Sequence, residues 1–180
     1  ARSYRRAWSV IEKVTPDVDW QEIINDRADD LLVSIALLKL NRRPNFKKLP
    51  QEIQYDVRAF YGSYKSIVNE ADELLFSAGN LDFISEEANQ SHIGKRLPTA
   101  LYIHTSAMGE LAPVLRVYEG CARWLSGDIE DATLIKLATD RPKVSYLSYP
   151  DFDQDPHPKL VSSTYVKLDK LDVDYRDYST

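Results

Sequence analysis

Three stretches in the second half of the chain decide its fold class: "ATLIKLAT" (132–139), "KVSYLSY" (143–149) and "STYVKLDKLDVDY" (163–175). Each stretch alternates apolar and polar residues, and together they are rich in valine, tyrosine and threonine. Alternation sends successive side chains to opposite faces of a strand, and these residue types are enriched in strands. The three stretches therefore predict β-strands.

The residues just upstream add a strand and a helix. "ALYIHTSAM" (100–108) predicts a strand, whereas "LAPVLRVYEGCARWL" (111–125) has the length and apolar spacing of a helix. Because strands and a helix occur together, the second half of the chain is predicted to be α+β.

The first eighty residues predict helices. Asp19 and Glu22 form a capping-box pattern, which satisfies the free amides at a helix start. Apolar residues then recur at mostly helical spacing until "NRRP" (41–44), where the proline ends the helix. A second helix is predicted over "LPQEIQYDVRAF" (49–60), and a third begins after Ser63.

The expected organisation is a helical bundle over residues 1–80, a connector over 81–97 and an α+β domain over 98–180. "SYRRAWSVIEKV" (3–14) and "SYKSIVNEADEL" (63–74) both begin with serine, tyrosine and a basic residue and continue into a predicted helix. This weak similarity indicates a helix-turn-helix-like repeat. The chain also opens without methionine, in what looks like the middle of a helix. We therefore expect a fragment of a longer protein, truncated at the end of its α+β domain.

Composition narrows the class of protein. The 180 residues are 43% hydrophobic, which is enough to form a buried core. The net charge of −5 argues against a protein whose whole surface is basic for binding nucleic acid. The single cysteine, Cys121, excludes an internal disulfide framework or a thiolate zinc cluster, and its helical pattern predicts a buried small residue. No signal peptide or membrane-length apolar run is present, which predicts a cytoplasmic protein without a membrane partner.

A basic cluster lies at the predicted junction between helices, in "NRRPNFKKLP" (41–50). Clustered cations bind phosphates with release of counterions, and a helix start adds free amides and hydroxyls. The alternative is a solvated basic loop. The predicted DNA-binding residues are Arg42, Arg43, Lys47, Lys48, Ser63, Tyr64 and Lys65.

The stretch "YPDFDQDPHP" (149–158) has residue types that suit a divalent metal or acid–base chemistry. Its prolines limit chain freedom, however, and closely spaced aspartates cap turns through bonds to the backbone. We predict a structural turn without catalytic residues or a metal. In the alternative, metal-assisted reading, the candidates are Asp151, Asp153, Asp155 and His157, with His104 or Lys95 assisting.

Several catalytic signatures are missing from the sequence. It has no glycine-rich nucleotide loop, no serine elbow and no paired-cysteine motif. In particular, no glycine-rich strand-to-helix turn is available to hold S-adenosylmethionine. We therefore expect no cofactor for these residues.

Three long blocks resemble a known family: "RRPNFKKLPQEIQYDVRAFYGSYKSIVNEADELLFSAG" (42–79), "IGKRLPTALYIHTSAMGELAPVLRVYEGCARWLSGD" (93–128) and "PKVSYLSYPDFDQDPHPKLVSSTYVKLDKLDVDYRDYS" (142–179). They are similar to the C-terminal half of bacterial DNA phosphorothioation-associated proteins that carry a methyltransferase-like domain. The resemblance implies that this domain precedes the chain and that the family continues past Thr180. It implies DNA and other DNA-modification proteins as partners, with S-adenosylmethionine expected only for the missing domain.

The first block is also similar to short helical repeats found beside homing endonucleases. The matching positions are Arg43, Pro44, Gly62, Ser63 and Tyr64. This second resemblance implies DNA contact by the helical half.

Three functional hypotheses follow. The leading one is a DNA-engaging, non-catalytic region of a DNA-modification or phage-defence protein. The second is a metal-assisted nuclease or other DNA-processing domain built on residues 149–158, which we call the acidic turn. The third is a protein–protein assembly module.

Overall fold

The computed structural model describes residues 2–16 and 18–179 and shows an α+β fold with a helical N-terminal region. The α-helices are α1 (Arg2–Val14), α2 (Trp20–Leu37), α3 (Gln51–Phe60), α4 (Tyr64–Ser77), α5 (Leu81–Gln90) and α6 (Pro113–Ser126). Short 3-10 helices are η1 (Leu38–Asn41), η2 (Phe46–Lys48) and η3 (Thr105–Glu110). The strands are β1 (Lys95–Leu97), β2 (Ala100–His104), β3 (Leu134–Ala138), β4 (Lys143–Ser148), β5 (Ser162–Lys167) and β6 (Asp172–Asp177).

Local chemistry sets the ends of the helices. The Asp19 carboxylate caps α2 by accepting hydrogen bonds from the amides of Gln21 and Glu22, both at 3.0 Å. The Ser63 hydroxyl caps α4 by accepting from the Ser66 amide at 3.1 Å. Both predicted caps are confirmed.

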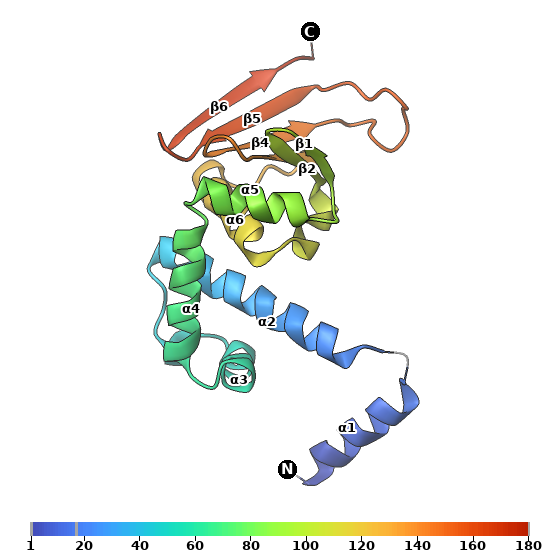
Figure 1. The fold of residues 1–180 in the computed structure, drawn as a ribbon, viewed down its shortest axis with the longest axis vertical. Helices are drawn as coiled ribbons and strands as arrows, with labels where there is room; N and C mark the ends of the chain where they lie inside the picture. Colours follow the sequence, from blue (N-terminus) through green and yellow to red (C-terminus); the bar gives the residue numbers. More distant parts are fainter. Residues whose placement is uncertain (1, 17, 180) are drawn as a thin grey trace.

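The strands form one antiparallel sheet in the order β1-β2-β3-β4-β5-β6, so each strand pairs with its neighbour in sequence. Strands are confirmed in all four predicted stretches of the second half. The stretch 100–108 is a strand only to His104 and then a 3-10 helix, and 163–175 contains two strands separated by a turn at 168–171. One face of the sheet packs against α5 and α6, and the other face is open (Figure 1). Leu101, Ile103 and Leu137 are fully buried on the helix side.

The expected connector over 81–97 is wrong, because this segment forms α5 and β1. The Asn80 side chain caps α5 by accepting from the amides of Asp82 and Phe83. Ile84 and Ala88 occupy the helix face that is fully buried. Only these few positions on a short polar helix turn toward the core, so the sequence pattern resembles a loop.

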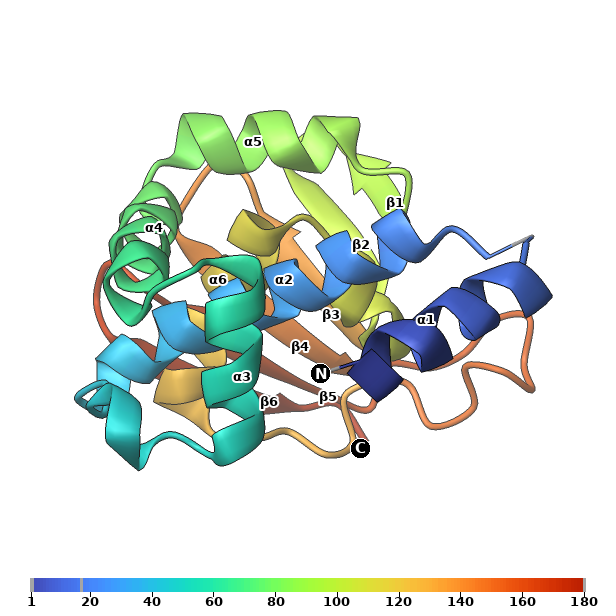
Figure 2. The ribbon, with the colours of Figure 1, turned by 90° about the horizontal axis from the view of Figure 1, so that it is seen from below.

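The helical half and the sheet half share one hydrophobic core. Helices α2 and α4 pack against α6, which packs against the sheet (Figure 2). Gly120 of α6 lies where a β-carbon would collide with the Leu37 side chain of α2, which explains the close crossing of these helices. Helix α1 instead lies apart from the rest of the molecule (Figure 1).

Two sets of buried hydrogen bonds connect α6 to the sheet. The Tyr146 hydroxyl of β4 donates to the Glu119 carboxylate at 2.9 Å, and Arg123 donates to the same carboxylate oxygen. The Tyr118 hydroxyl accepts from the Lys143 amide at 2.8 Å, which anchors the turn between β3 and β4.

Among the helices described, none has both the length and the apolar character needed to cross a membrane.

Candidate nucleic-acid interface

The strand register defines the open face of the sheet. Directly paired residues of antiparallel strands lie on the same face. One such row runs across every strand, through Lys95, Tyr102, Lys136, Ser145, Tyr165 and Asp174. Lys143 and Lys167 pair beside this row, and Ser163 and Arg176 pair beyond it. We call the residues of these rows the outer face.

Cations and tyrosine rings contact one another on the outer face. The Lys136 ammonium lies 5.2 Å from the centre of the Tyr102 ring. Lys143 and Arg176 both lie over the Tyr165 ring, at 4.1 Å and 5.1 Å from its centre. These distances are within the range of cation–π attraction, which holds the cations and the rings together at the surface.

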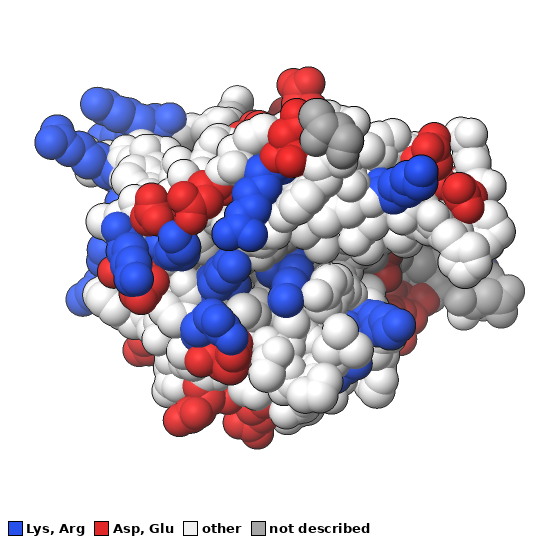
Figure 3. Space-filling model, turned by 90° about the horizontal axis from the view of Figure 1, so that it is seen from above, with Lys and Arg blue, Asp and Glu red and all other residues white. Residues whose placement is uncertain are grey.

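The positive charge of this face is only partly neutralised. Lys167 pairs with Asp172 and Asp174 at the edge of the sheet. Lys136 and Lys143 have no ion-pair partner among the described residues. Figure 3 looks onto this face, where Lys and Arg side chains gather over the middle and most acidic ones lie nearer the rim. A cationic surface therefore exists on a chain whose net charge is −5.

The pKa of Lys143 reflects the positive charges that surround it. Burial lowers the pKa of Lys143, and the nearby cations lower it further. These cations are Lys136, Arg141, Arg176 and Lys167. An anion bound among them would relieve their repulsion.

A hollow of about 130 Å³ opens on the outer face beside the turn between β3 and β4. Small side chains, Ala138 and Ser145, lie in it next to the longer side chains of Lys136, Lys143 and Tyr165. The outer face thus combines a charged surface with a defined recess.

The structure gives three of the predicted DNA-binding residues internal roles. The Arg43 side chain is only 10% exposed, donates to the Ile35 carbonyl at 2.8 Å and pairs with Asp72 at 2.8 Å. The Ser63 hydroxyl is the cap of α4, and the Tyr64 hydroxyl donates to the Pro44 carbonyl at 2.6 Å. These groups hold the loop in place, so they are a poor fit to the predicted phosphate contacts.

The lowered pKa of Asp72 indicates that its contact with Arg43 is an ion pair. Burial opposes ionisation of Asp72, but hydrogen bonds from Lys39 and Arg43 outweigh it and hold its pKa below the usual value. Arg43 therefore links the end of α2 to α4 by charge as well as by hydrogen bonding.

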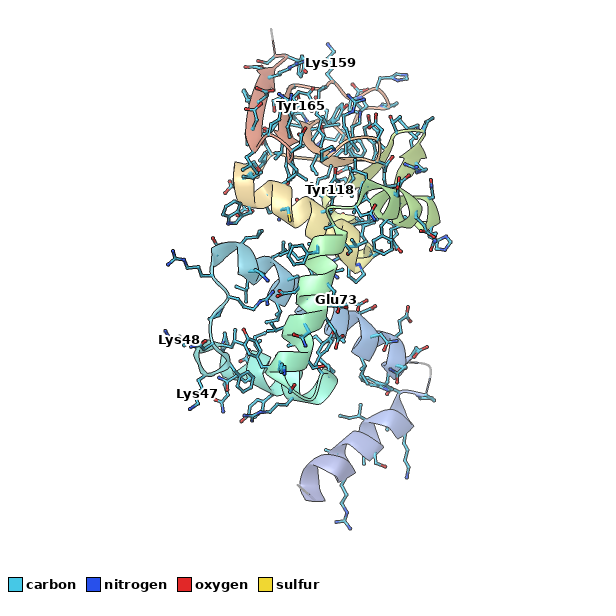
Figure 4. The ribbon with its side chains drawn as sticks, turned by 60° about the vertical axis from the view of Figure 1, so that its left-hand side comes forward. Lys47, Lys48, Glu73, Tyr118, Lys159 and Tyr165 are labelled. Atoms are coloured by element: carbon cyan, nitrogen blue, oxygen red, sulfur yellow. The ribbon has the colours of Figure 1, made fainter. Side chains whose placement is uncertain are left out.

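The remaining predicted DNA-binding residues are exposed. They are Arg42, Lys47, Lys48 and Lys65. Figure 4 places Lys47 and Lys48 on the helical part of the molecule, far from Tyr165 on the sheet. The exposed loop cations and the outer face are therefore separate surfaces.

The acidic turn is exposed and held by its own backbone. The amides of Gln154 and Asp155 donate to the Asp151 carbonyl at 3.0 and 2.9 Å, and the Asp155 carboxylate accepts from the His157 amide at 2.8 Å. Within the described part of the chain, no three His, Cys, Asp or Glu side chains are gathered as metal ligands. Asp151, Asp153, Asp155 and His157 therefore do not form a preassembled metal centre.

The two assisting residues lie in different settings. His104 caps η3 by accepting from the Ser106 amide at 3.2 Å, and its ring lies 5.7 Å from that of Phe152 in the acidic turn. Lys95 is exposed on β1, the edge strand.

Burial, followed by the charge of Glu119, raises the pKa of the Cys121 thiol to about 11, which disfavours the nucleophilic thiolate at neutral pH.

A larger hollow, about 740 Å³, lies between α2, α6 and the residues before α3. Its lining is mainly apolar and includes Leu38, Leu49, Ile53 and Trp124. The two arginines in the lining, Arg116 and Arg123, are already paired with Asp30 and Glu119, so this hollow is a weaker candidate for an anion site than the outer face.

Sequence reasoning missed the residues of the outer face. Lys136, Lys143 and Tyr165 lie in stretches that predict strands, and Arg176 follows the last of these stretches. The available signal is that lysine and tyrosine recur at the polar positions of those strands. No family model, curated protein or solved structure matches this chain.

Proposed function

We propose that this chain is a DNA-engaging region that binds single-stranded DNA on the outer face of its sheet. The observation that carries the proposal is the contact between Lys143, Arg176 and the Tyr165 ring, repeated by Lys136 and Tyr102. Cations attract the phosphates of the backbone, and tyrosine rings offer stacking surfaces to unpaired bases.

The shape of the surface favours a single strand. An open antiparallel sheet presents its side chains across a broad surface, so several nucleotides can lie on it at once. The proposal keeps the DNA partner that the family resemblance implies, but it moves the main contact surface from the helical loop to the sheet. The helical loop is a less suitable DNA-binding surface, because Arg43, Ser63 and Tyr64 already make hydrogen bonds within the protein.

Fluorescence anisotropy with a labelled single-stranded oligonucleotide tests the proposal. Replacing Lys136, Lys143 and Arg176 together by glutamine should weaken binding at least about tenfold. The slope of log affinity against log salt should flatten by about 0.7 for each lost phosphate contact. A separate Tyr165→Leu variant should weaken binding through lost stacking, by about 1–3 kcal/mol.

The matched control removes the same number of exposed cations from the loop. An Arg42→Gln, Lys47→Gln, Lys48→Gln variant should bind almost as tightly as the parent protein. If the loop variant loses binding and the sheet variant does not, the helical surface predicted from the sequence is the correct one. Parallel titrations with duplex DNA and single-stranded RNA define the preferred nucleic acid.

A further inference from the structure

The hollow on the outer face is built from side chains of suitable chemistry. Its lining includes the cations Lys136, Lys143 and Arg141, the carboxylate Asp140, and the hydroxyl residues Thr99 and Ser145. Arg141 is paired with Asp140, so the two lysines provide the uncompensated charge. Two unpaired positive charges match a phosphate dianion better than the single charge of a phosphodiester.

The Ser145 hydroxyl independently points to a ligand. Ser145 is only 2% exposed as a residue, and no hydrogen bond joins its hydroxyl to another residue that the structure describes. The hydroxyl oxygen is not among the buried polar atoms left without a partner, so it opens on the hollow. It lines the hollow, where Ala138 leaves space beside it. A hydroxyl that opens on a recess without a protein partner is free to donate its hydrogen to a bound anion.

The hollow is also bordered by hydrogen-bonded backbone and is of suitable size. Its wall is formed by two turns, which are joined by a 2.9 Å hydrogen bond from the Thr139 amide to the Thr99 carbonyl. The Tyr118 hydroxyl, below the sheet, holds the Lys143 amide at 2.8 Å. About 130 Å³ exceeds the ~30 Å³ of one water but is smaller than the ~300 Å³ of typical ligand pockets. The space suits a phosphoryl group rather than a whole nucleotide.

We propose that this hollow binds a dianionic phosphomonoester, namely the terminal phosphate of the DNA strand that lies on the outer face. This inference rests on the proposed function for the strand, whereas the phosphate site itself stands on the lining of the hollow. Lys136 and Lys143 neutralise the dianion, and the Thr99 and Ser145 hydroxyls donate hydrogen bonds to its oxygens. The strand then has a fixed end on the sheet.

The test compares otherwise identical single-stranded oligonucleotides with a 5′-phosphate, a 3′-phosphate or hydroxyls at both ends. One phosphorylated form should bind the parent protein about tenfold more tightly than the hydroxyl form, as expected for charge-assisted hydrogen bonds. Ser145→Ala and a Lys136→Gln, Lys143→Gln double variant should remove most of this advantage. Lys47→Gln, an exposed cation on the helical part of the molecule, should leave the advantage unchanged.

Inorganic phosphate provides a readout that needs no variant and no DNA. Titration into the labelled parent protein, at constant ionic strength against chloride, should shift the amide NMR signals of Lys136, Lys143 and Ser145. It should also raise the melting temperature, because a ligand that binds only the folded state stabilises it. Phosphate that perturbs the loop around Lys47 but not these residues would contradict the inference.

The outcomes separate the two proposals. If hydroxyl and phosphorylated oligonucleotides bind equally tightly, the terminal-phosphate inference is wrong while binding to the outer face stands. If phosphate perturbs the hollow but no oligonucleotide binds, the hollow is an anion site and the proposed DNA function is wrong. If the double variant unfolds, the oligonucleotide comparison on Ser145→Ala and the phosphate titration of the parent protein still decide the inference.

Discussion

At the scale of single residues, Arg43 shows how position changes the role of a cation. Arg42 and Arg43 are neighbours in a basic cluster, yet Arg42 is exposed and Arg43 is mostly buried. The Arg43 guanidinium bridges the Ile35 carbonyl at the end of α2 and the Asp72 carboxylate of α4. Removing it leaves a carbonyl and a partly buried carboxylate without this partner.

We predict that Arg43→Ala lowers the free energy of unfolding by about 2 kcal/mol, because the Ile35 carbonyl loses its charged donor and Asp72 keeps only Lys39 as an ion-pair partner. Urea denaturation followed by circular dichroism measures the change. Lys47→Ala, an exposed cation in the same loop, should change it by less than about 0.5 kcal/mol. Equal effects of the two substitutions would show that Arg43 is not a structural residue.

At the scale of secondary-structure elements, the β1–β2 pair depends on Gly94. Its φ angle is +84°, and a β-carbon there would collide with the Tyr102 carbonyl oxygen of β2. Glycine adopts this backbone conformation without strain, whereas other residues do not. The sheet edge that carries Lys95 therefore needs glycine at this position.

Gly94→Ala should lower the free energy of unfolding by at least about 2 kcal/mol, because left-handed strain adds to the collision with the backbone. Thermal and urea unfolding provide the measurement. Gly109→Ala is the matched control, because an added β-carbon there has no atom within 4 Å. A loss no larger than that of the control would contradict the role of Gly94.

At the scale of the whole molecule, helices and sheet share one hydrophobic core. The core includes Leu31, Ile35 and Ile67 from the helical half together with Leu115 and Leu137 from the sheet half. Since α6 packs on both α2 and the sheet, neither half buries its apolar surface alone. The boundary between two separate domains expected from the sequence is therefore not reflected in the core.

A fragment of residues 92–180 should accordingly show no cooperative thermal unfolding and weak near-ultraviolet circular dichroism. A fragment of residues 18–180 should unfold like the full chain, because α1 lies apart from the core (Figure 1). Differential scanning calorimetry of the two fragments makes the comparison. A cooperative transition in the shorter fragment would mean that the sheet half is an independent domain.

The sequence by itself determined the helix caps at Asp19 and Ser63, the end of the helix before Pro44 and the strands of the second half. These features depend on neighbouring residues, so short patterns reveal them. It did not reveal α5, because too few of its residues face the core. Only the tertiary structure decided that Arg43 turns inward and Lys143 outward, and that Lys136, Ser145 and Tyr165 from three strands lie in one row. The physical reason is that burial and cross-strand pairing depend on residues distant in the chain, which a local pattern cannot specify.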